Sequence, residues 1–368
     1  MTADFSVLSL ISIYSGVRVY TTRSTELPIM DQRKIVSLGR SSLVVSLPKH
    51  WVKMNELKQG DVVSLTVQRD RSLAVFPGTG RAERPRETTL HIDPNEKGVS
   101  IVRRLIACYL NGYSGIKLIS EDTFSVAQLK AIRRIVRILY MRIMDSGAKS
   151  VYITTLIDES KASVTSGVHR MYMISNSMCR DALNSVGDRD VALAKAVYSL
   201  DDDVDHFSFF LLRLLRQVAL DPTMANQLGL QPLDCLDYQT LVHRIEQVAD
   251  LAANIAKQVI MLNGREQRIS DPLLKLILTS GNDVVDSYFR AIEGFFSEDV
   301  TASDGIIEHQ KKVEKRDQEI ASKAFLDEQS NPLIICAICS MRDSIKRIAE
   351  YAADIAEITI NRSFSSSL

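Results

Sequence analysis

The sequence has no excess of charge of either sign, and this limits what the whole molecule can bind by electrostatics. Its 368 residues hold 45 Lys and Arg against 45 Asp and Glu. A neutral chain has no overall field that would draw it to nucleic acid or to an anionic membrane. Any such binding therefore has to come from a local patch.

Cysteine is also scarce. The five cysteines are odd in number and lie far apart, which does not describe a secreted disulfide framework. We therefore expect the protein to be cytoplasmic. Cys336 and Cys339 have CxxC spacing, but no second CxxC or nearby histidine completes a zinc site, so a buried helix is the favoured interpretation.

Long apolar runs and common catalytic motifs are missing as well. The apolar run from Phe5 to Tyr14 is too short to span a bilayer and lacks the basic flank of a signal peptide, so we expect no membrane insertion. The chain has no Gly-x-x-x-x-Gly-Lys-Ser/Thr phosphate loop and no Gly-x-Ser-x-Gly elbow. The sequence therefore does not indicate an enzyme.

The chain is long for one domain, and a β-rich module opens its regular part. Residues 30–77 read as two strands broken at Gly39, a helix over Lys49–Leu57 and two further strands. This module is too small for a full core, and its open strand edges invite a second copy. We expect a homodimer formed by swapped hairpins. Residues 1–29 are expected to be a disordered extension or a mis-assigned start.

Two further regions separate this module from the helical part. Residues 78–90, rich in proline, glycine and arginine, are a predicted linker. Residues 91–160 are a predicted α/β connector. Its expected elements are a helix over Val99–Leu110, a strand over Gly115–Ser120, a long helix over Ser125–Met144 and a strand over Ser150–Ile157.

The rest of the chain is predicted to be helical, so the fold class is multidomain and mainly α. Breaks such as Gly187-Asp188 and Asn331-Pro332 divide it into six amphipathic helices. These form two antiparallel three-helix bundles, residues 163–264 and 265–362, with a tail over 363–368.

An internal repeat relates the two bundles. The segment Glu246-Gln-Val-Ala-Asp250-Leu-Ala-Ala-Asn254 aligns with Lys346-Arg-Ile-Ala-Glu350-Tyr-Ala-Ala-Asp354 at an offset of one hundred residues. Acidic residues at i, i+4 spacing share a helix face and repel unless something binds them. The paired positions are Asp201 with Asp205, Glu246 with Asp250, and Glu350 with Asp354.

Two interpretations of these carboxylates stay open. Any one pair can be a solvated helix face, but recurrence at equivalent positions of the repeat favours metal binding. Oxygen ligands suit iron, manganese, magnesium or zinc, and the sequence does not distinguish among them.

The segment Glu246-Gln-Val-Ala-Asp250 and the preceding Asp201-Asp-Asp-Val-Asp205 resemble the signature helices of the PhoU family. This resemblance implies paired three-helix bundles that bind metal clusters and regulate phosphate uptake. Lys346 stands where the signature has glutamate, which puts the second site in doubt.

The β-rich module resembles the AbrB/SpoVT swapped-hairpin DNA-binding domain, on the segments Ser42-Leu-Val-Val-Ser-Leu-Pro48-Lys-His-Trp51 and Leu57-Lys-Gln-Gly60-Asp61. The pairing with PhoU repeats resembles archaeal PhoU-type regulators. A basic patch would contact DNA phosphates. It comprises Arg33, Lys34, Arg40, Lys49 and Lys53. The alternative is that the module only dimerises and these residues keep it soluble.

Three functions follow from these features. The first is a non-enzymatic regulator of phosphate homeostasis that binds the promoter of phosphate-transport genes. The second is an accessory protein that controls a phosphate transporter or sensor kinase by direct contact. The third, a di-metal carboxylate enzyme, would need Glu-x-x-His segments, whereas the chain has only the reversed His243-x-x-Glu246.

Overall fold

The computed structural model describes residues 31–39, 42–67, 71–78, 86–157, 162–263, 268–326 and 331–365. The chain forms two compact units, Met1–Arg84 and Pro85–Leu368. The expectations for residues 1–29, for Arg40 and for most of the linker lie outside the described residues. No helix within the described ranges combines the length and the apolar character that a bilayer span needs.

The first unit is built from two short hairpins and one helix. Strand β1 (Val36–Leu38) pairs antiparallel with β2 (Ser42–Val44), and β3 (Val63–Val67) pairs antiparallel with β4 (Leu73–Pro77). Helix α1 (Lys49–Met54) lies between the hairpins in sequence. Gly39 and Gly60 adopt φ of +71° and +98°, which glycine tolerates without strain. The expected order of elements is therefore present, with a helix shorter than predicted.

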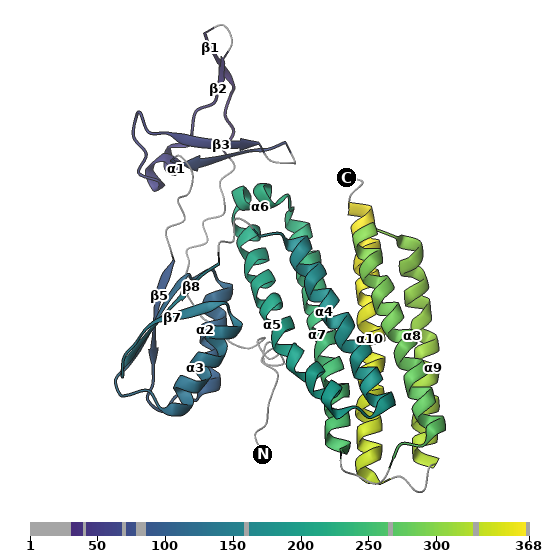
Figure 1. The fold of residues 1–368 in the computed structure, drawn as a ribbon. Coiled ribbons are helices and arrows are strands. Elements are labelled where there is room, and N and C mark those ends of the chain that lie inside the picture. Colours follow the sequence, from purple (N-terminus) through teal and green to yellow (C-terminus); the bar gives the residue numbers. More distant parts are fainter. Residues whose placement is uncertain are drawn as a thin grey trace. The chain divides into compact units, whose positions relative to one another are not determined.

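The second unit begins with a layer of two helices and one mixed sheet. Strands β5 (Glu87–Ile92), β6 (Gly115–Ser120), β8 (Ser150–Thr155) and β7 (Met141–Ser146) follow one another across the sheet in this order. Strand β5 is parallel to β6, and the other pairs are antiparallel. Helices α2 (Gly98–Leu110) and α3 (Val126–Ile138) pack together beside this sheet (Figure 1).

Two expectations for this layer were wrong. The helix predicted to run to Met144 ends at Ile138, because Tyr140 adopts a φ of +50° and the chain turns into β7. Strand β5 begins inside the segment expected to be a linker. Strand β7 forms because it pairs with β8, and β5 forms because it pairs with β6. Such pairing depends on distant parts of the chain, so the local sequence does not predict it.

Six long helices of the second unit form two sets of three (Figure 1). The first set is α4 (Val164–Asp188), α5 (Val191–Leu220) and α7 (Pro232–Leu262), and a short α6 (Pro222–Leu228) joins the last two. The second set is α8 (Asp271–Ser297), α9 (Val300–Leu326) and α10 (Pro332–Ser365). The fold class predicted from the sequence is thus confirmed: mainly helical, with a small β module before the bundles.

The two sets share one hydrophobic core. Helix α4 packs on α8, and α7 packs on α10. The buried rings of Tyr172 and Tyr288 meet edge to face at 5.8 Å, and the Tyr288 hydroxyl lies 2.8 Å from Oγ of Ser175. These contacts join equivalent first helices of the two repeats, so one continuous hydrophobic core spans both bundles.

Candidate functional site

Four carboxyl groups predicted as metal ligands lie together between α5 and α7. Asp201 and Asp205 face Glu246 and Asp250 because each pair is one helical turn apart and the two helices pack along their length. Side-chain hydrogen bonds join Asp250 to Asp201 and to Glu246. A hydrogen bond between two carboxyl groups requires that one of them carries a proton.

The cluster is buried, and this decides its electrostatics. Asp205 and Glu246 are 3% and 5% exposed. Burial, followed by the charges of the neighbouring carboxylates, raises the pKa of both well above the ordinary range. The same two causes, burial first and then Asp250, raise the pKa of Asp201 to about 7. The four groups therefore resist full ionisation unless positive charge is supplied.

One oxygen of the cluster is left without a partner. Oε1 of Glu246 is buried and accepts no hydrogen bond from any of the described residues. An orphaned carboxylate oxygen in a dry site is costly, and a hard cation would satisfy it. The donor set therefore fits such a cation in its chemistry. As they stand, no three or more His, Cys, Asp or Glu side chains of the described residues are arranged to hold a metal ion.

The equivalent region of the second repeat is built differently. Lys346 lies 3.8 Å from Glu350, and Asp354 pairs with Arg244 of α7 at 2.8 Å. The structure thus places both predicted ligands of this repeat beside cationic side chains. Asp317 of α9, which the sequence analysis did not single out, lies 3.1 Å from Arg342. Each of these three acidic side chains therefore has a cationic partner within the chain.

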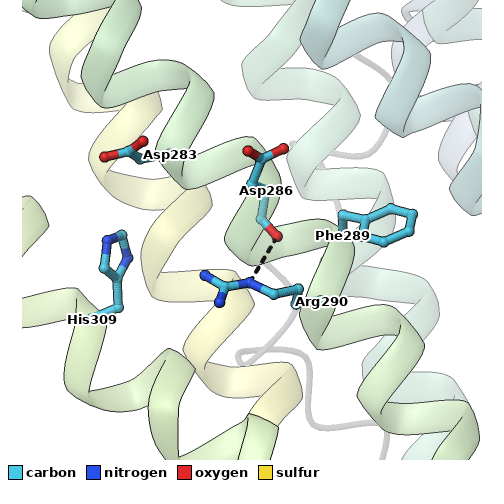
Figure 2. A pocket seen from close by; sticks show the side chains of 5 residues that line it. All are labelled: Asp283, Asp286, Phe289, Arg290 and His309. Carbon is cyan, nitrogen blue, oxygen red and sulfur yellow. Dashed lines mark hydrogen bonds between the residues drawn. The ribbon is translucent and has the colours of Figure 1, made fainter.

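The second repeat also contains a pocket of about 450 Å³ between α8 and α9. Figure 2 shows Asp283, Asp286, Phe289 and Arg290 on one helix and His309 on the other. Its carboxylates contact arginines: Asp283 pairs with Arg316, and Asp286 pairs with Arg180 at 3.1 Å. Because Asp283 and Asp286 each have an arginine partner, this pocket differs from the carboxylate cluster between α5 and α7.

The predicted DNA-binding residues that the structure describes all lie on the surface. Lys49 and Lys53 are one turn apart on α1, and both are exposed. Lys34 is exposed as well, whereas Arg33 donates to Asp31 at 2.9 Å, so part of its charge is neutralised. Helix α1 therefore presents the clearer basic face of this module.

The two predicted cysteines of the CxxC segment lie in α10 with free thiols. The helix was predicted correctly, but Cys336 is exposed rather than buried. Its neighbour Cys339 is half-buried. The segment carries no zinc ligand set within the described residues.

Sequence reasoning missed the contact between the α/β connector and α5, the helix that carries Asp201 and Asp205. Arg134 and Arg137 of α3 lie 3.7 and 3.9 Å from Asp202 of α5. In the sequence, Arg133, Arg134 and Arg137 lie on one side of the predicted helix, a pattern more typical of a solvated face than of an anion site. Its position opposite an aspartate run follows only from the packing of α3 on α5.

The structure therefore defines a protein of paired three-helix bundles with a buried carboxylate cluster, preceded by a small β module. Residues 168–259 and 277–359 match the PhoU domain family. Residues 36–83 match the family described as antidote-toxin recognition MazE, bacterial antitoxin.

Individual relatives agree with these family matches. Two proteins named phosphate-specific transport system accessory protein PhoU homolog, from the NA1000 / CB15N and CB 15 strains of Caulobacter vibrioides, are 25% identical over 209 residues. The match covers 54% of this chain and 86% of each relative. The chain is therefore a PhoU-domain protein: it carries two PhoU domains behind a MazE/AbrB-like domain, and it is homologous to PhoU phosphate transport accessory proteins.

Two solved structures are also similar to the helical part. The structure of PhoU from Pseudomonas aeruginosa has a TM-score of 0.48 at 20% identity and covers 54% of this chain and 93% of that one. The phosphate transport system regulatory protein PhoU from Streptococcus pneumoniae has a TM-score of 0.43 at 15% identity, with coverages of 54% and 91%.

Proposed function

We propose that this chain is a non-enzymatic, cytoplasmic regulator of phosphate uptake that acts on transcription. In this proposal the MazE/AbrB-like module binds promoter DNA of phosphate-transport genes, and the PhoU repeats bind metal ions and relay phosphate status. The observation that carries the proposal is the presence of two PhoU domains and a MazE/AbrB-like domain in one chain. In a protein that acts only at a transporter, the MazE/AbrB-like module would serve for dimerisation alone.

Exposed apolar side chains support a homodimer formed through this module. None of the module's described side chains is buried, and its strands leave large apolar groups in solvent. Leu38, Leu43, Leu65 and Val67 are 65%, 75%, 59% and 71% exposed. A soluble module rarely leaves such a surface uncovered, and a second copy would bury it. Dimerisation would also double the basic face of α1.

A titration of fluorescent promoter DNA tests the DNA-binding part. The DNA should come from the phosphate-transport locus of the same genome, with a scrambled duplex of equal length beside it. We expect preferential binding that weakens as salt rises, because phosphate contacts release counterions. The test variant is Lys49→Ala with Lys53→Ala, and the matched control, Lys257→Ala with Lys275→Ala, removes the same charge from exposed bundle positions.

Each outcome of this titration decides between two functions. Loss of binding in the module variant, with binding retained in the control, would support a transcriptional regulator. Absence of binding by the intact chain even at low salt would favour the accessory protein that contacts a transporter or sensor kinase, with the module only dimerising. The names of the Caulobacter relatives, which are transport-system accessory proteins, support that second candidate.

The metal part of the proposal rests on the carboxylate cluster. Asp201, Asp205, Glu246 and Asp250 would hold iron, manganese, zinc or magnesium, and the bound cation would supply the positive charge that lets them ionise. Glu350 and Asp354 are retained as predicted ligands of a weaker second site. Elemental analysis of protein purified without chelators should find stoichiometric metal that Asp250→Ala loses and the exposed Asp304→Ala keeps. A sub-stoichiometric metal content that is equal in the wild type, Asp250→Ala and Asp304→Ala would contradict the proposed metal site.

A further inference from the structure

Charge is distributed unevenly along this neutral chain. Residues 86–157, which form the α/β connector, hold 11 Lys and Arg against 6 Asp and Glu. Residues 158–368, which form the bundles, hold 22 against 32. The connector is therefore basic and the bundles are acidic, although the totals cancel. Such an asymmetry between parts of one chain is typical of proteins that bind a polyanion through one part only.

Helix α3 carries more of this positive charge than any other element of the connector. It holds four cations in 13 residues and contains no acidic residue. The four cations are all exposed: Lys130, Arg133, Arg134 and Arg137. They follow one another at spacings of three or four residues, so they lie along one face of the helix. This basic face is the surface considered below.

Two of the four cations have a partner within the chain. Arg134 and Arg137 lie 3.7 and 3.9 Å from Asp202 of α5. Their side chains are 48% and 72% exposed, so these ion pairs are open to solvent. The side chains of Lys130 and Arg133 form no ion pair or hydrogen bond with any other described residue. Their charge is therefore available to an external anion.

The basic face fits a nucleic-acid backbone better than a membrane. A helix that lies on a bilayer inserts an exposed apolar face beside its cations. In α3 the apolar side chains of Ile132, Ile135 and Ile138 are buried in the connector, and Val126 at the first turn is the exception. Only the charged face is presented to a partner. Duplex DNA carries one phosphate charge per about 1.7 Å of its axis, which suits a row of lysine and arginine.

We propose that α3 is a second DNA-contacting surface, at which Lys130 and Arg133 bind backbone phosphates of the duplex that the MazE/AbrB-like module holds. The inference rests on the proposed DNA binding by that module. Nine residues separate Pro77, the end of β4, from Glu87, the start of β5. Because the tether is short, DNA bound by the module is at a high local concentration for the connector. Phosphate contacts carry no sequence information, so α3 adds affinity and the module supplies sequence preference.

A fluorescence anisotropy titration of promoter DNA with the full chain, between about 50 and 200 mM salt, tests this surface. The test variant is Lys130→Ala with Arg133→Ala. Each lost phosphate contact lowers the slope of log affinity against log salt by about 0.9, so the slope should become less steep by about 2. At the lower salt the affinity should fall about 10-fold or more, equally for promoter and scrambled DNA.

Two matched variants separate this surface from a general effect of charge. Lys117→Ala with Arg142→Ala removes the same charge from exposed positions of β6 and β7. Lys117 alternates along β6 with buried side chains, so it lies on the opposite face of the sheet from them. This variant should keep the slope of the wild type. Lys130→Arg with Arg133→Lys retains both charges and should also bind like the wild type.

The α3 surface and the proposed function can fail separately in this titration. An unchanged slope in the α3 variant, while Lys49→Ala with Lys53→Ala abolishes binding, would overturn the α3 surface and leave the proposed function intact. An equal loss in the Lys117 and Arg142 variant would overturn it as a general effect of charge. Absence of DNA binding by the intact chain at low salt would overturn both.

Sedimentation with vesicles of phosphatidylglycerol and phosphatidylcholine in equal parts tests the membrane alternative. The α3 surface predicts that the intact chain and the α3 variant do not differ in vesicle binding. Vesicle binding that only the α3 variant loses, with its DNA binding unchanged, would assign the basic face to lipid and overturn the inference. Circular dichroism verifies that each variant is folded.

Discussion

Replacing Asp201 by asparagine should stabilise the metal-free protein at neutral and alkaline pH. The amide keeps the size of the side chain and can hydrogen-bond to Asp250, but it cannot ionise. In the folded protein, burial and the charge of Asp250 raise the pKa of Asp201 from 3.8 to about 7. The folded state therefore favours the protonated carboxyl, whereas the unfolded chain releases its proton at the ordinary pKa.

The sign and size of the effect follow from this difference. Below about pH 4 both states carry the proton, so the carboxyl costs nothing. As pH rises from about 4 towards about 7, ionisation of Asp201 stabilises the unfolded state relative to the folded state, so the free energy of unfolding falls. A change of one pKa unit corresponds to about 1.4 kcal/mol. The rise in the pKa of Asp201 from 3.8 to about 7 therefore sets an upper limit of about 4 kcal/mol on the gain in stability. Because the cluster carboxyls interact and relax together, we expect about 2 to 4 kcal/mol for this one substitution.

Urea unfolding in the presence of a chelator, at about pH 5 and about pH 8, measures this effect. Helical circular dichroism should follow it, because the single tryptophan, Trp51, lies in the β module and would report on that part. Asp304→Asn, at an exposed position of α9, should change stability by less than about 0.5 kcal/mol. A variant no more stable than the wild type at the higher pH would refute the reasoning. So would a stability gain that does not shrink at the lower pH.

Two other substitutions test how the second unit is held together. Arg213→Ala should lower the free energy of unfolding by about 2 to 4 kcal/mol, because it removes a buried guanidinium that donates to the main-chain oxygens of Tyr109, at the end of α2, and of Tyr113, in the following loop. Thermal unfolding measures this loss, and an unchanged melting temperature would contradict a structural role for Arg213. Gly281→Ala should cost about 1 to 3 kcal/mol, because its Cβ would lie 2.6 Å from Cδ2 of Leu183. Combining it with Leu183→Ala should recover part of that cost, and strict additivity in the double-mutant cycle would show that α4 and α8 are not in close contact there.

The carboxylate cluster could be predicted from the sequence because it depends on the spacing of acidic residues within single helices. Acids one turn apart share a face of a helix whichever way that helix packs, and the alignment of Glu246 with Lys346 located the repeat. The predicted helix likewise began at Ser125, which the structure shows as the N-cap of α3. Such signals need no knowledge of the tertiary structure.

Features that depend on distant parts of the chain were missed for the same reason. Strands β5 and β7 form only against their partners in the sheet, so a helix was predicted where β7 lies. Arg134 looks like one member of a solvated stripe until α3 is placed against α5. Asp317 of α9 pairs with Arg342 of α10, a contact between two helices that spacing along a single helix does not predict. Pairing between elements decides all three cases.

Transcript levels of the phosphate-transport genes test the central claim most directly. They would be measured in phosphate-replete cells that carry the intact gene, a deletion, or the Lys49→Ala, Lys53→Ala variant. The proposed function predicts that the deletion and the variant change these transcripts in the same direction, while the Lys257→Ala, Lys275→Ala control behaves like the intact gene. Transcripts that stay unchanged in both, even where phosphate uptake itself is altered, would contradict regulation of transcription.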